Sequence, residues 1–289
     1  MLARLFAYLQ YLLPKFWMTA IVYRLTRVRH VGIKDFLITR FIRLYDVETE
    51  DVELTIPTDF TTFNKFFIRE LKDGARPIDA SDHSIVSPVD GTVSQAGQLR
   101  GDAIFQAKGI EYSLGDLLAT NLDDARAYTS GCFATIYLAP YNYHRVHAPL
   151  AGTLVSASYV PGDLFSVNAA TAAYVSGLFR RNERLVLNFE TTRGPAAIVL
   201  VGALNVGSIT TPWSGEIRPR SKGVVETVDL GPTPVSVNKG DLLGWFNMGS
   251  TVILLLPDGR CQWNGSLVAG ATVRMGAPIG TSSDANNLR

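Results

Sequence analysis

The sequence is poor in the residues that build zinc sites and disulfide frameworks. Its 289 residues include two cysteines, Cys132 and Cys261, and they form no Cys-x-x-Cys pair. This spacing excludes a zinc ribbon and a disulfide scaffold, so we expect buried or idle thiols in a reducing compartment. The Gly-x-Ser-x-Gly elbow that carries the nucleophile of α/β-hydrolases is also absent from the sequence.

The N-terminal region has no apolar run long enough to cross a bilayer. Its longest charge-free run is the ten residues from Leu5 to Pro14, whereas a spanning helix needs about twenty. No small-residue cleavage site follows this run, so a secretory signal is not indicated. Two short helices separated by Pro14, rich in aromatics and cations, are typical of a segment that lies in the membrane interface. A helical pair packed on its own domain is the alternative.

Charge is unevenly distributed along the chain. The whole sequence carries a formal net charge of +1, but Met1 to Tyr45 holds eight lysines or arginines against one acid, which makes this part +7 and the remainder −6. A basic leader on an acidic body favours an anionic partner, either a membrane surface or a nucleic acid. Nucleic acid is disfavoured because the cations alternate with large aliphatic residues.

The periodicity of apolar residues changes near Pro77. Up to Leu71 it is helical, and Thr61 to Asn64 predicts the start of a helix that would end near Gly74 and Pro77. From Ile85 onward the chain reads as short β-rich runs punctuated by glycine and proline. The predicted strands are 91–96, 133–138, 153–160, 185–190, 197–209, 235–237, 242–246 and 251–256, with short helices at 113–119 and 169–179. The expected fold is α+β: a helical, membrane-associating region over 1–75 and a compact, mostly-β domain over 76–289.

The stretch from Leu242 to Pro257 is the most distinctive part of the sequence. It reads as two apolar strands joined by a tight Asn-Met-Gly turn, with Ser250 and Thr251 where the second strand begins. Asn and Gly reverse a chain at little steric cost, so the turn alone has a structural explanation. Ser250 nevertheless follows a turn and precedes a strongly apolar strand, a setting that can hold a peptide bond rigidly.

Each of the four histidines can be weighed separately. His30 stands among arginines and His83 in a polar loop, which indicates solvated surface. His144 and His147 lie three residues apart after an apolar strand. Because no cysteine or carboxylate lies beside them to complete a ligand set, proton transfer is favoured over metal binding. Asp90, before Gly91, would by itself be an ordinary turn aspartate.

Several blocks of sequence, in this order along the chain, resemble the bacterial phosphatidylserine decarboxylase precursors. They are Leu13-Pro14-Lys15, Thr62-Phe63-Asn64-Lys65-Phe66-Phe67, Tyr143 to Pro149, Val160 to Asn168, and Met248-Gly249-Ser250-Thr251. The last block departs from the Leu-Gly-Ser-Thr motif of that family at Met248, a substitution that conserves volume and apolarity. The resemblance covers essentially the whole chain.

The resemblance implies an enzyme that makes its own cofactor. Asp90, His147 and Ser250 would form the charge-relay group that breaks the Gly249–Ser250 bond, leaving a large fragment 1–249 and a small fragment 250–289. Ser250 would become a pyruvoyl group that forms a Schiff base with the substrate amine. His144 is the expected proton donor, with His147 as second choice and Tyr137, Tyr141 and Tyr143 as unranked alternatives. No pyridoxal phosphate and no metal are expected.

The resemblance also implies partners and a location. The substrate would be phosphatidylserine and the product phosphatidylethanolamine, as part of phospholipid biosynthesis. The two fragments would form a heterodimer, with a higher homo-oligomer left open, on the cytoplasmic side of the cell membrane as a peripheral protein. Leu164 and Phe165, at the tip of the 160–168 loop, would either add a second apolar membrane contact or lie in a buried turn.

Two other functions remain open on the residues. A serine hydrolase would use Asp90, His147 and Ser250 on an external ester and would stay uncut. A membrane-bound binding module of the lipoyl or hammerhead type is suggested by Ser87 to Val93, and it would not depend on Ser250. The absence of a lysine at the carrier position of that turn counts against the module.

Overall fold

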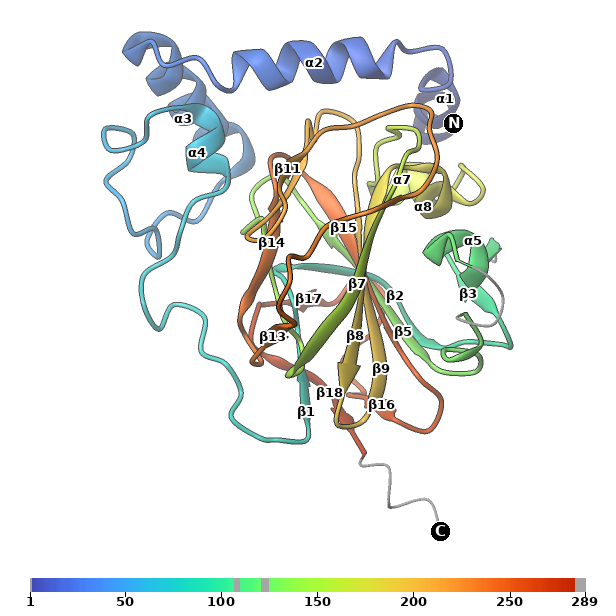
Figure 1. Ribbon diagram of the computed structural model, residues 1–289. Helices are drawn as coiled ribbons and strands as arrows, with labels where there is room; N and C mark the ends of the chain where they lie inside the picture. Colours follow the sequence, from blue (N-terminus) through green and yellow to red (C-terminus); the bar gives the residue numbers. More distant parts are fainter. Residues whose placement is uncertain (1, 107–109, 121–124, 284–289) are drawn as a thin grey trace.

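The computed structural model describes residues 2–106, 110–120 and 125–283. Within these residues, four helices precede the first strand, and three short helices lie between strands of the β body (Figure 1). The helices are α1 (Leu2–Leu9), α2 (Lys15–Leu25), α3 (Val31–Tyr45), α4 (Phe63–Phe67), α5 (Leu114–Leu118), α7 (Ala169–Ala172) and α8 (Leu178–Arg181). The described part of the chain is thus helical at its N-terminus and mostly β thereafter, which confirms the predicted α+β class.

Local sequence explains where the first helices begin and end. Pro14 separates α1 from α2, as predicted, because its ring suits the start of a helix but not the interior. α3 stops at Asp46, which adopts a left-handed conformation with φ of 50°. The Thr62 side chain caps α4 by accepting a hydrogen bond from the Lys65 backbone at 3.1 Å.

The predicted end of α4 near Gly74 is wrong, because the helix ends at Phe67. The carbonyl of Ile68 accepts a hydrogen bond from Arg145 Nε at 3.1 Å instead of continuing the helix. Leu71 then forms a β-bridge with Val52. Tertiary contacts therefore stop the helix one turn after its cap.

The strands form a large antiparallel sheet and three smaller ones. The large sheet has the order β12-β7-β8-β9-β15-β5-β2-β17, with β13 also paired to β7. A four-stranded sheet has the order β11-β10-β14-β6, a three-stranded sheet β1-β18-β16, and a hairpin β3-β4. The bounds are β1 (Ser84–Val86), β2 (Gly91–Gln98), β3 (Ala103–Phe105), β4 (Glu111–Ser113), β5 (Cys132–Leu138), β6 (Arg145–His147), β7 (Gly152–Val160), β8 (Arg184–Thr191), β9 (Gly194–Val201), β10 (Ile209–Thr211), β11 (Gly215–Ile217), β12 (Glu226–Thr227), β13 (Val235–Val237), β14 (Leu242–Phe246), β15 (Ser250–Leu256), β16 (Cys261–Trp263), β17 (Thr272–Val273) and β18 (Pro278–Ser282).

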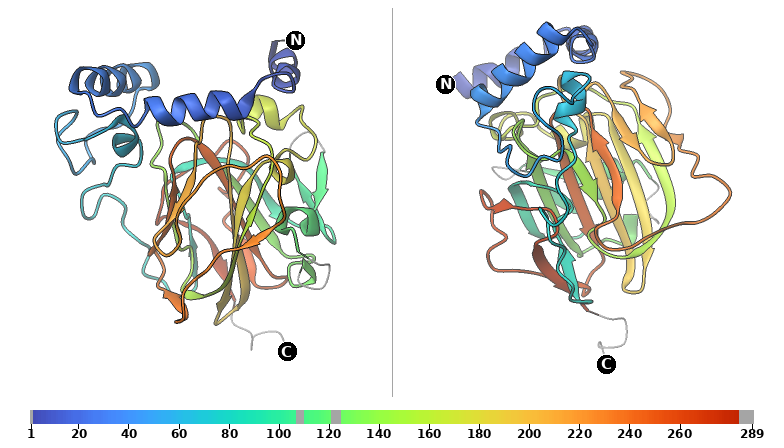
Figure 2. Two further views of the ribbon diagram at one scale, coloured as in Figure 1. Left: turned by 45° about the horizontal axis from the view of Figure 1, so that its top comes forward. Right: turned by 90° about the vertical axis from the view of Figure 1, so that its left-hand side faces the viewer.

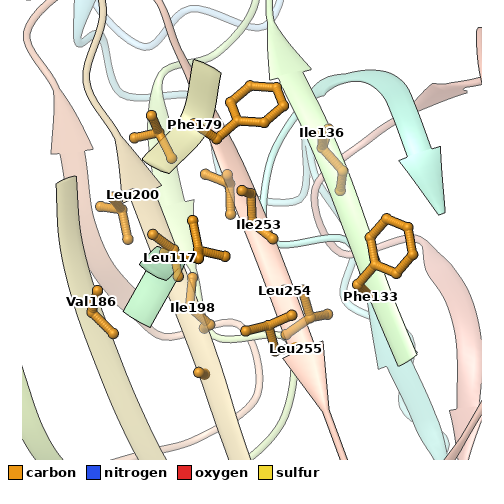
Figure 3. Close-up of a cluster of buried hydrophobic side chains, with 14 of the residues drawn as sticks. Leu117, Phe133, Ile136, Phe179, Val186, Ile198, Leu200, Ile253, Leu254 and Leu255 are labelled. Carbon is orange, nitrogen blue, oxygen red and sulfur yellow. The ribbon is translucent and has the colours of Figure 1, made fainter. Parts of the chain in front are cut away.

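β15 runs through the middle of the large sheet. It pairs with β5 on one side, Ser250 opposite Leu138, and with β9 on the other, Thr251 opposite Val201. All its residues are buried, as a continuous apolar run predicts for a strand covered on both faces. Figure 3 shows Ile253, Leu254 and Leu255 among the side chains of neighbouring strands and short helices.

The predicted turn before Ser250 joins two sheets rather than two partners of one hairpin. β14 belongs to the four-stranded sheet, where its neighbours are β10 and β6, while β15 belongs to the large sheet. The sequence pattern correctly located both strands, but pairing was decided by more distant segments. Residues 247–249 therefore mark the point where the chain passes from one sheet to the other.

The N-terminal helices lie along one end of the β body, opposite the C-terminal end of the described chain (Figure 2). Many of their large apolar side chains are exposed, among them Trp17, Phe36 and Leu44, as is Leu12 between α1 and α2. Within the described residues, no helix is both long enough and apolar enough to cross a membrane.

The 160–168 loop is a buried turn and not a second membrane contact, because Leu164 and Phe165 are buried.

A second apolar cluster joins the helices to the β body. It contains Phe41 of α3 and Phe63, Phe66 and Phe67 of α4, and it packs against Trp245 of β14 and Met248 in the passage between the sheets. The segment immediately before Ser250 is thus covered by the helical region.

Truncating a side chain of β15 should destabilise the protein strongly. Leu254 is fully buried, so Leu254→Ala should lower the free energy of unfolding by about 2–5 kcal/mol through lost burial and an unfilled cavity. Urea unfolding of the Ser250→Ala chain, followed by tryptophan fluorescence, measures this. Leu12→Ala, at a side chain 82% exposed, should change stability by less than about 0.5 kcal/mol. Equal effects would contradict the central position of β15.

Candidate active site

Ser250 is the first residue of β15 and is fully buried. Its backbone is fixed by the ladder to Leu138 of β5. Its hydroxyl has no hydrogen-bond partner among the described residues. A buried hydroxyl without a partner costs free energy, so this atom is a candidate for chemistry rather than for structural support.

The turn before Ser250 is held by amide side chains. Asn247 Nδ2 donates to Ser208 Oγ at 2.7 Å and to Thr210 Oγ1 at 3.0 Å. From the helical side, Asn64 Nδ2 donates to the Asn247 carbonyl at 2.9 Å. These contacts fix the start of the turn that leads to Gly249 from both the four-stranded sheet and α4.

His144 is the histidine beside this turn. Its Nδ1 bonds the Asn142 carbonyl at 2.8 Å, and since a carbonyl only accepts, Nδ1 carries the proton and Nε2 a lone pair. That Nε2 is buried, has no partner among the described residues, and lies 3.7 Å from the point where a Cβ on Gly249 would be. The Phe67 ring packs on the imidazole with centroids 4.1 Å apart.

Burial keeps His144 neutral. It lowers the pKa of the imidazole to about 3, and the nearby charge of Arg69 acts in the same direction. Near neutral pH, His144 therefore presents a lone pair toward the junction of Gly249 and Ser250. A proton placed on it would be given up readily.

His147 faces different partners. Its Nδ1 donates to the Gly240 carbonyl at 2.8 Å, and its Nε2 accepts from the Tyr143 hydroxyl at 3.0 Å. Burial lowers the pKa of His147, while the Gly240 contact and the charge of Asp90 oppose that shift. Both ring nitrogens are occupied in this conformation.

Asp90 is engaged by an arginine. Its carboxylate accepts hydrogen bonds from Arg76 Nε at 3.0 Å and Nη2 at 2.7 Å, and one oxygen also accepts from the Met275 backbone at 2.8 Å. Arg76 in turn bridges to Asp51 at 2.8 Å. Asp90 raises the pKa of His147 through its charge and not through a hydrogen bond.

The residues expected to act together thus lie in two adjacent groups. Ser250 and His144 lie at the turn, and Asp90 and His147 lie with Tyr143 and Arg76; among the described residues no hydrogen bond joins His147 to Ser250. Residues three apart on an extended chain point to opposite faces, which explains why the two histidines have different neighbours.

The sequence analysis missed Arg69, Asn64 and Asn247. Arg69 is 4% exposed, and together with Tyr141, Tyr143 and Asp90 it lines a cavity of 340 Å³ beside the two groups. A single arginine in Ile68-Arg69-Glu70 gives no pattern that would have singled it out. The motif Thr62 to Phe67 contained Asn64, but its contact with Asn247 depends on the fold.

The described residues contain no cluster of three or more histidine, cysteine or acidic side chains placed to hold a metal ion.

Comparison with known proteins identifies the family of this chain. The model of the phosphatidylserine decarboxylase family matches residues 63–281, and a second family model, described as PSD, matches residues 5–46. The chain is 45% identical to the phosphatidylserine decarboxylase proenzyme of Alcanivorax borkumensis over 98% of both chains. It is 46% identical to the proenzyme of Shewanella sediminis, over 96% of this chain and 98% of that one. The chain therefore belongs to the phosphatidylserine decarboxylase family.

Proposed function

We propose that this protein is a carboxy-lyase that converts phosphatidylserine to phosphatidylethanolamine with a pyruvoyl group made from Ser250. The observation that carries the proposal is the presence, at the Gly249–Ser250 junction, of a buried hydroxyl and a buried imidazole nitrogen, neither of which has a partner among the described residues. Family membership gives this junction its meaning, because the relatives are named as proenzymes.

Self-cleavage would begin when a base removes the proton of Ser250 Oγ. The oxygen attacks the Gly249 carbonyl carbon, the peptide C–N bond breaks, and an ester and a free amino group result. Loss of the α-proton of residue 250 breaks the ester C–O bond, which leaves the Gly249 carboxylate and dehydroalanine. Water then replaces the nitrogen, which leaves as ammonia. Fragments 1–249 and 250–289 are the products.

We assign the base to His147, with Asp90 to stabilise its charged form. His144 is nearer to the bond, but a pKa of about 3 makes it a poor proton acceptor, whereas the Asp90 charge favours a proton on His147. His147 Nε2 must leave the Tyr143 hydroxyl to reach Ser250. Local rearrangement is therefore part of this proposal.

Residue 250 fits a prosthetic group generated by the chain itself, since it is buried, fixed by β15 and free of competing hydrogen bonds. A pyruvoyl group at this position would supply an electrophilic carbonyl for the substrate amine and an acceptor for the electron pair left when CO₂ departs. We assign the return of a proton to the α-carbon to His144, because its Nε2 faces this position and gives up a proton readily.

The two fragments would remain together as a heterodimer after cleavage. Fragment 250–289 contributes β15 to the middle of the large sheet, β17 to its edge beside β2, and β18 beside β1. The bond to be cut precedes β15, so cleavage breaks no strand of these ladders.

Peripheral attachment to the cytoplasmic face of the cell membrane is also proposed. The exposed apolar side chains of α1 to α3 lie at one end of the molecule, on a segment with a net charge of +7. Each lysine or arginine near an anionic leaflet contributes roughly 1 kcal/mol. Such a surface would bring the site to its lipid substrate.

Cleavage is tested by the intact mass of the denatured protein beside Ser250→Ala. We expect two fragments that separate between Gly249 and Ser250, the small one beginning with a pyruvoyl group, and a single chain in the variant. Native size-exclusion should show both fragments in one particle. An uncut wild-type chain that a fluorophosphonate labels at Ser250 would instead indicate the serine hydrolase.

The two histidines are separated by their alanine variants. His147→Ala should remain uncut, while His144→Ala should be cut but decarboxylate about 10²–10⁴ times more slowly, the usual loss for a proton-transfer group. Fragment masses and CO₂ release measure the two steps independently. Cleavage blocked in His144→Ala and retained in His147→Ala would transfer the role of the base to His144.

Membrane attachment is tested by sedimentation with phosphatidylglycerol vesicles, which contain no substrate. The double variant Trp17→Ala, Phe36→Ala removes two exposed aromatics, 74% and 64% accessible, and should bind at least about tenfold more weakly, since burying one large apolar side chain is worth about 1.5–3 kcal/mol. Val224→Ala, at an exposed residue of the β body, is the control. Unchanged binding of the double variant would contradict the proposed surface.

A further inference from the structure

Arg69 is a buried cation whose hydrogen-bonding capacity is largely unused. It follows α4 and is 4% exposed. Its Nη2 donates to the Tyr141 carbonyl at 2.9 Å, but Nε and Nη1 have no partner among the described residues. Burial lowers the pKa of Arg69 to about 10, so the side chain is still charged near neutral pH.

Such an arrangement is unfavourable unless an anion completes it. A buried charge without a counter-ion loses its hydration and gains no attraction that offsets this cost. Nearly all buried donors in folded proteins have hydrogen-bond partners. The Phe66 ring beneath the guanidinium, 5.4 Å away, supplies no hydrogen-bond acceptor for the two free donors. The geometry therefore points to a ligand with negatively charged oxygens.

The position of Arg69 places that ligand next to His144, the histidine that faces the Gly249–Ser250 junction. The Asn142 carbonyl accepts both from His144 Nδ1, at 2.8 Å, and from Arg69 Nη2, at 3.5 Å. The opposite nitrogen of His144 faces Gly249. The guanidinium and the Gly249–Ser250 junction thus flank one imidazole.

The cavity of 340 Å³ that Arg69 lines has other charges, most of them already paired. Arg76 binds Asp51 and Asp90, and Arg274 binds Glu48 at 3.0 Å. Asp46 also lines the cavity. Among the arginines of this wall, Arg69 is the one whose buried donors have no partner among the described residues.

We propose that Arg69 binds the phosphodiester of the lipid headgroup while the serine part reacts at residue 250. This inference rests on the proposed function. The substrate offers two anions, but the carboxylate must leave as uncharged CO₂, so an arginine on it would stabilise the ground state more than the transition state. The phosphodiester keeps its charge throughout and lies only a few bonds from the amine. Planar guanidinium groups bind phosphate well.

Occupation of the site also affects His144. The charge of Arg69 is one of the causes that keep the pKa of His144 low, after burial. A phosphodiester on Arg69 cancels much of that charge, so the imidazole accepts a proton more easily once substrate is bound. Arg69 would thereby couple headgroup recognition to the proton transfer at His144.

Binding can be measured without catalysis in the uncut Ser250→Ala chain. The probes are glycerophosphoserine, inorganic phosphate and serine, with affinity taken from calorimetry. We expect glycerophosphoserine to bind best and Arg69→Gln to weaken it at least about tenfold, as for a lost charge-assisted contact. Arg274→Gln, in the same cavity but paired with exposed Glu48, should have little effect. Equal affinity for inorganic phosphate would indicate a free-phosphate site and overturn the headgroup assignment.

Thermal unfolding separates a ligand site from a structural role. Removing an unpaired buried charge should leave the melting temperature of ligand-free Arg69→Gln unchanged or higher, and glycerophosphoserine should raise it only in the chain that keeps Arg69. A variant that melts earlier, with probe affinity intact, would make Arg69 structural and overturn the proposal.

Kinetics on a soluble short-chain phosphatidylserine keep the two proposals distinguishable. With cleavage unaffected, Arg69→Gln should raise KM about tenfold and shift the pH profile of kcat, whereas a structural loss would lower kcat alone. If the wild type were uncut and inactive but probe binding still depended on Arg69, the proposed function would fail and the anion site would stand. An active wild type whose KM does not depend on Arg69 would overturn the anion site alone.

Discussion

β15 is hydrogen-bonded along both edges, to β5 and to β9, and its residues are all buried. A strand held in this way cannot shift its register without moving every side chain to the opposite face of the sheet. Ser250 is therefore placed by the same ladder that stabilises the core. The neighbouring β5 ends at Leu138, and the chain returns within a few residues to bring His144 beside Ser250. The site depends on the central strand more than on any single side chain.

The helical region completes the site as well as covering it. Phe67 packs on His144, Asn64 holds the Asn247 carbonyl, and Met248 lies against the aromatic cluster of α3 and α4. These contacts make the environment of Ser250 dry, which strengthens electrostatic interactions there and lowers the pKa of both histidines. The same helices expose apolar side chains at the end of the molecule. A lipid surface there would lie next to the residues that close the site.

The sequence predicted best those features that depend on local pattern. The apolar run of β15 and the break at Pro14 were correctly placed because periodicity and proline geometry act within a few residues. Sheet membership was not predictable, since β14 finds its partners in β10 and β6, segments distant along the chain. For the same reason, the sequence identified Asp90 and His147 as candidates but did not indicate that Arg76 is hydrogen-bonded to Asp90 and Tyr143 to His147. Arg69 became visible only when its burial and its missing partners were known.

Four of the eleven buried side-chain polar atoms that have no partner among the described residues lie where the chemistry would occur. Ser250 Oγ, His144 Nε2, and Nε and Nη1 of Arg69 are all buried and unsatisfied among the described residues. Each costs stability, and a fold selected for stability alone would pair or replace them. Together they offer a hydroxyl that can lose a proton, a lone pair that can accept one, and a cation that can bind an anion, as the proposed reaction requires. Under the proposed function, a bound substrate would supply the acceptor that Nε and Nη1 of Arg69 lack among the described residues.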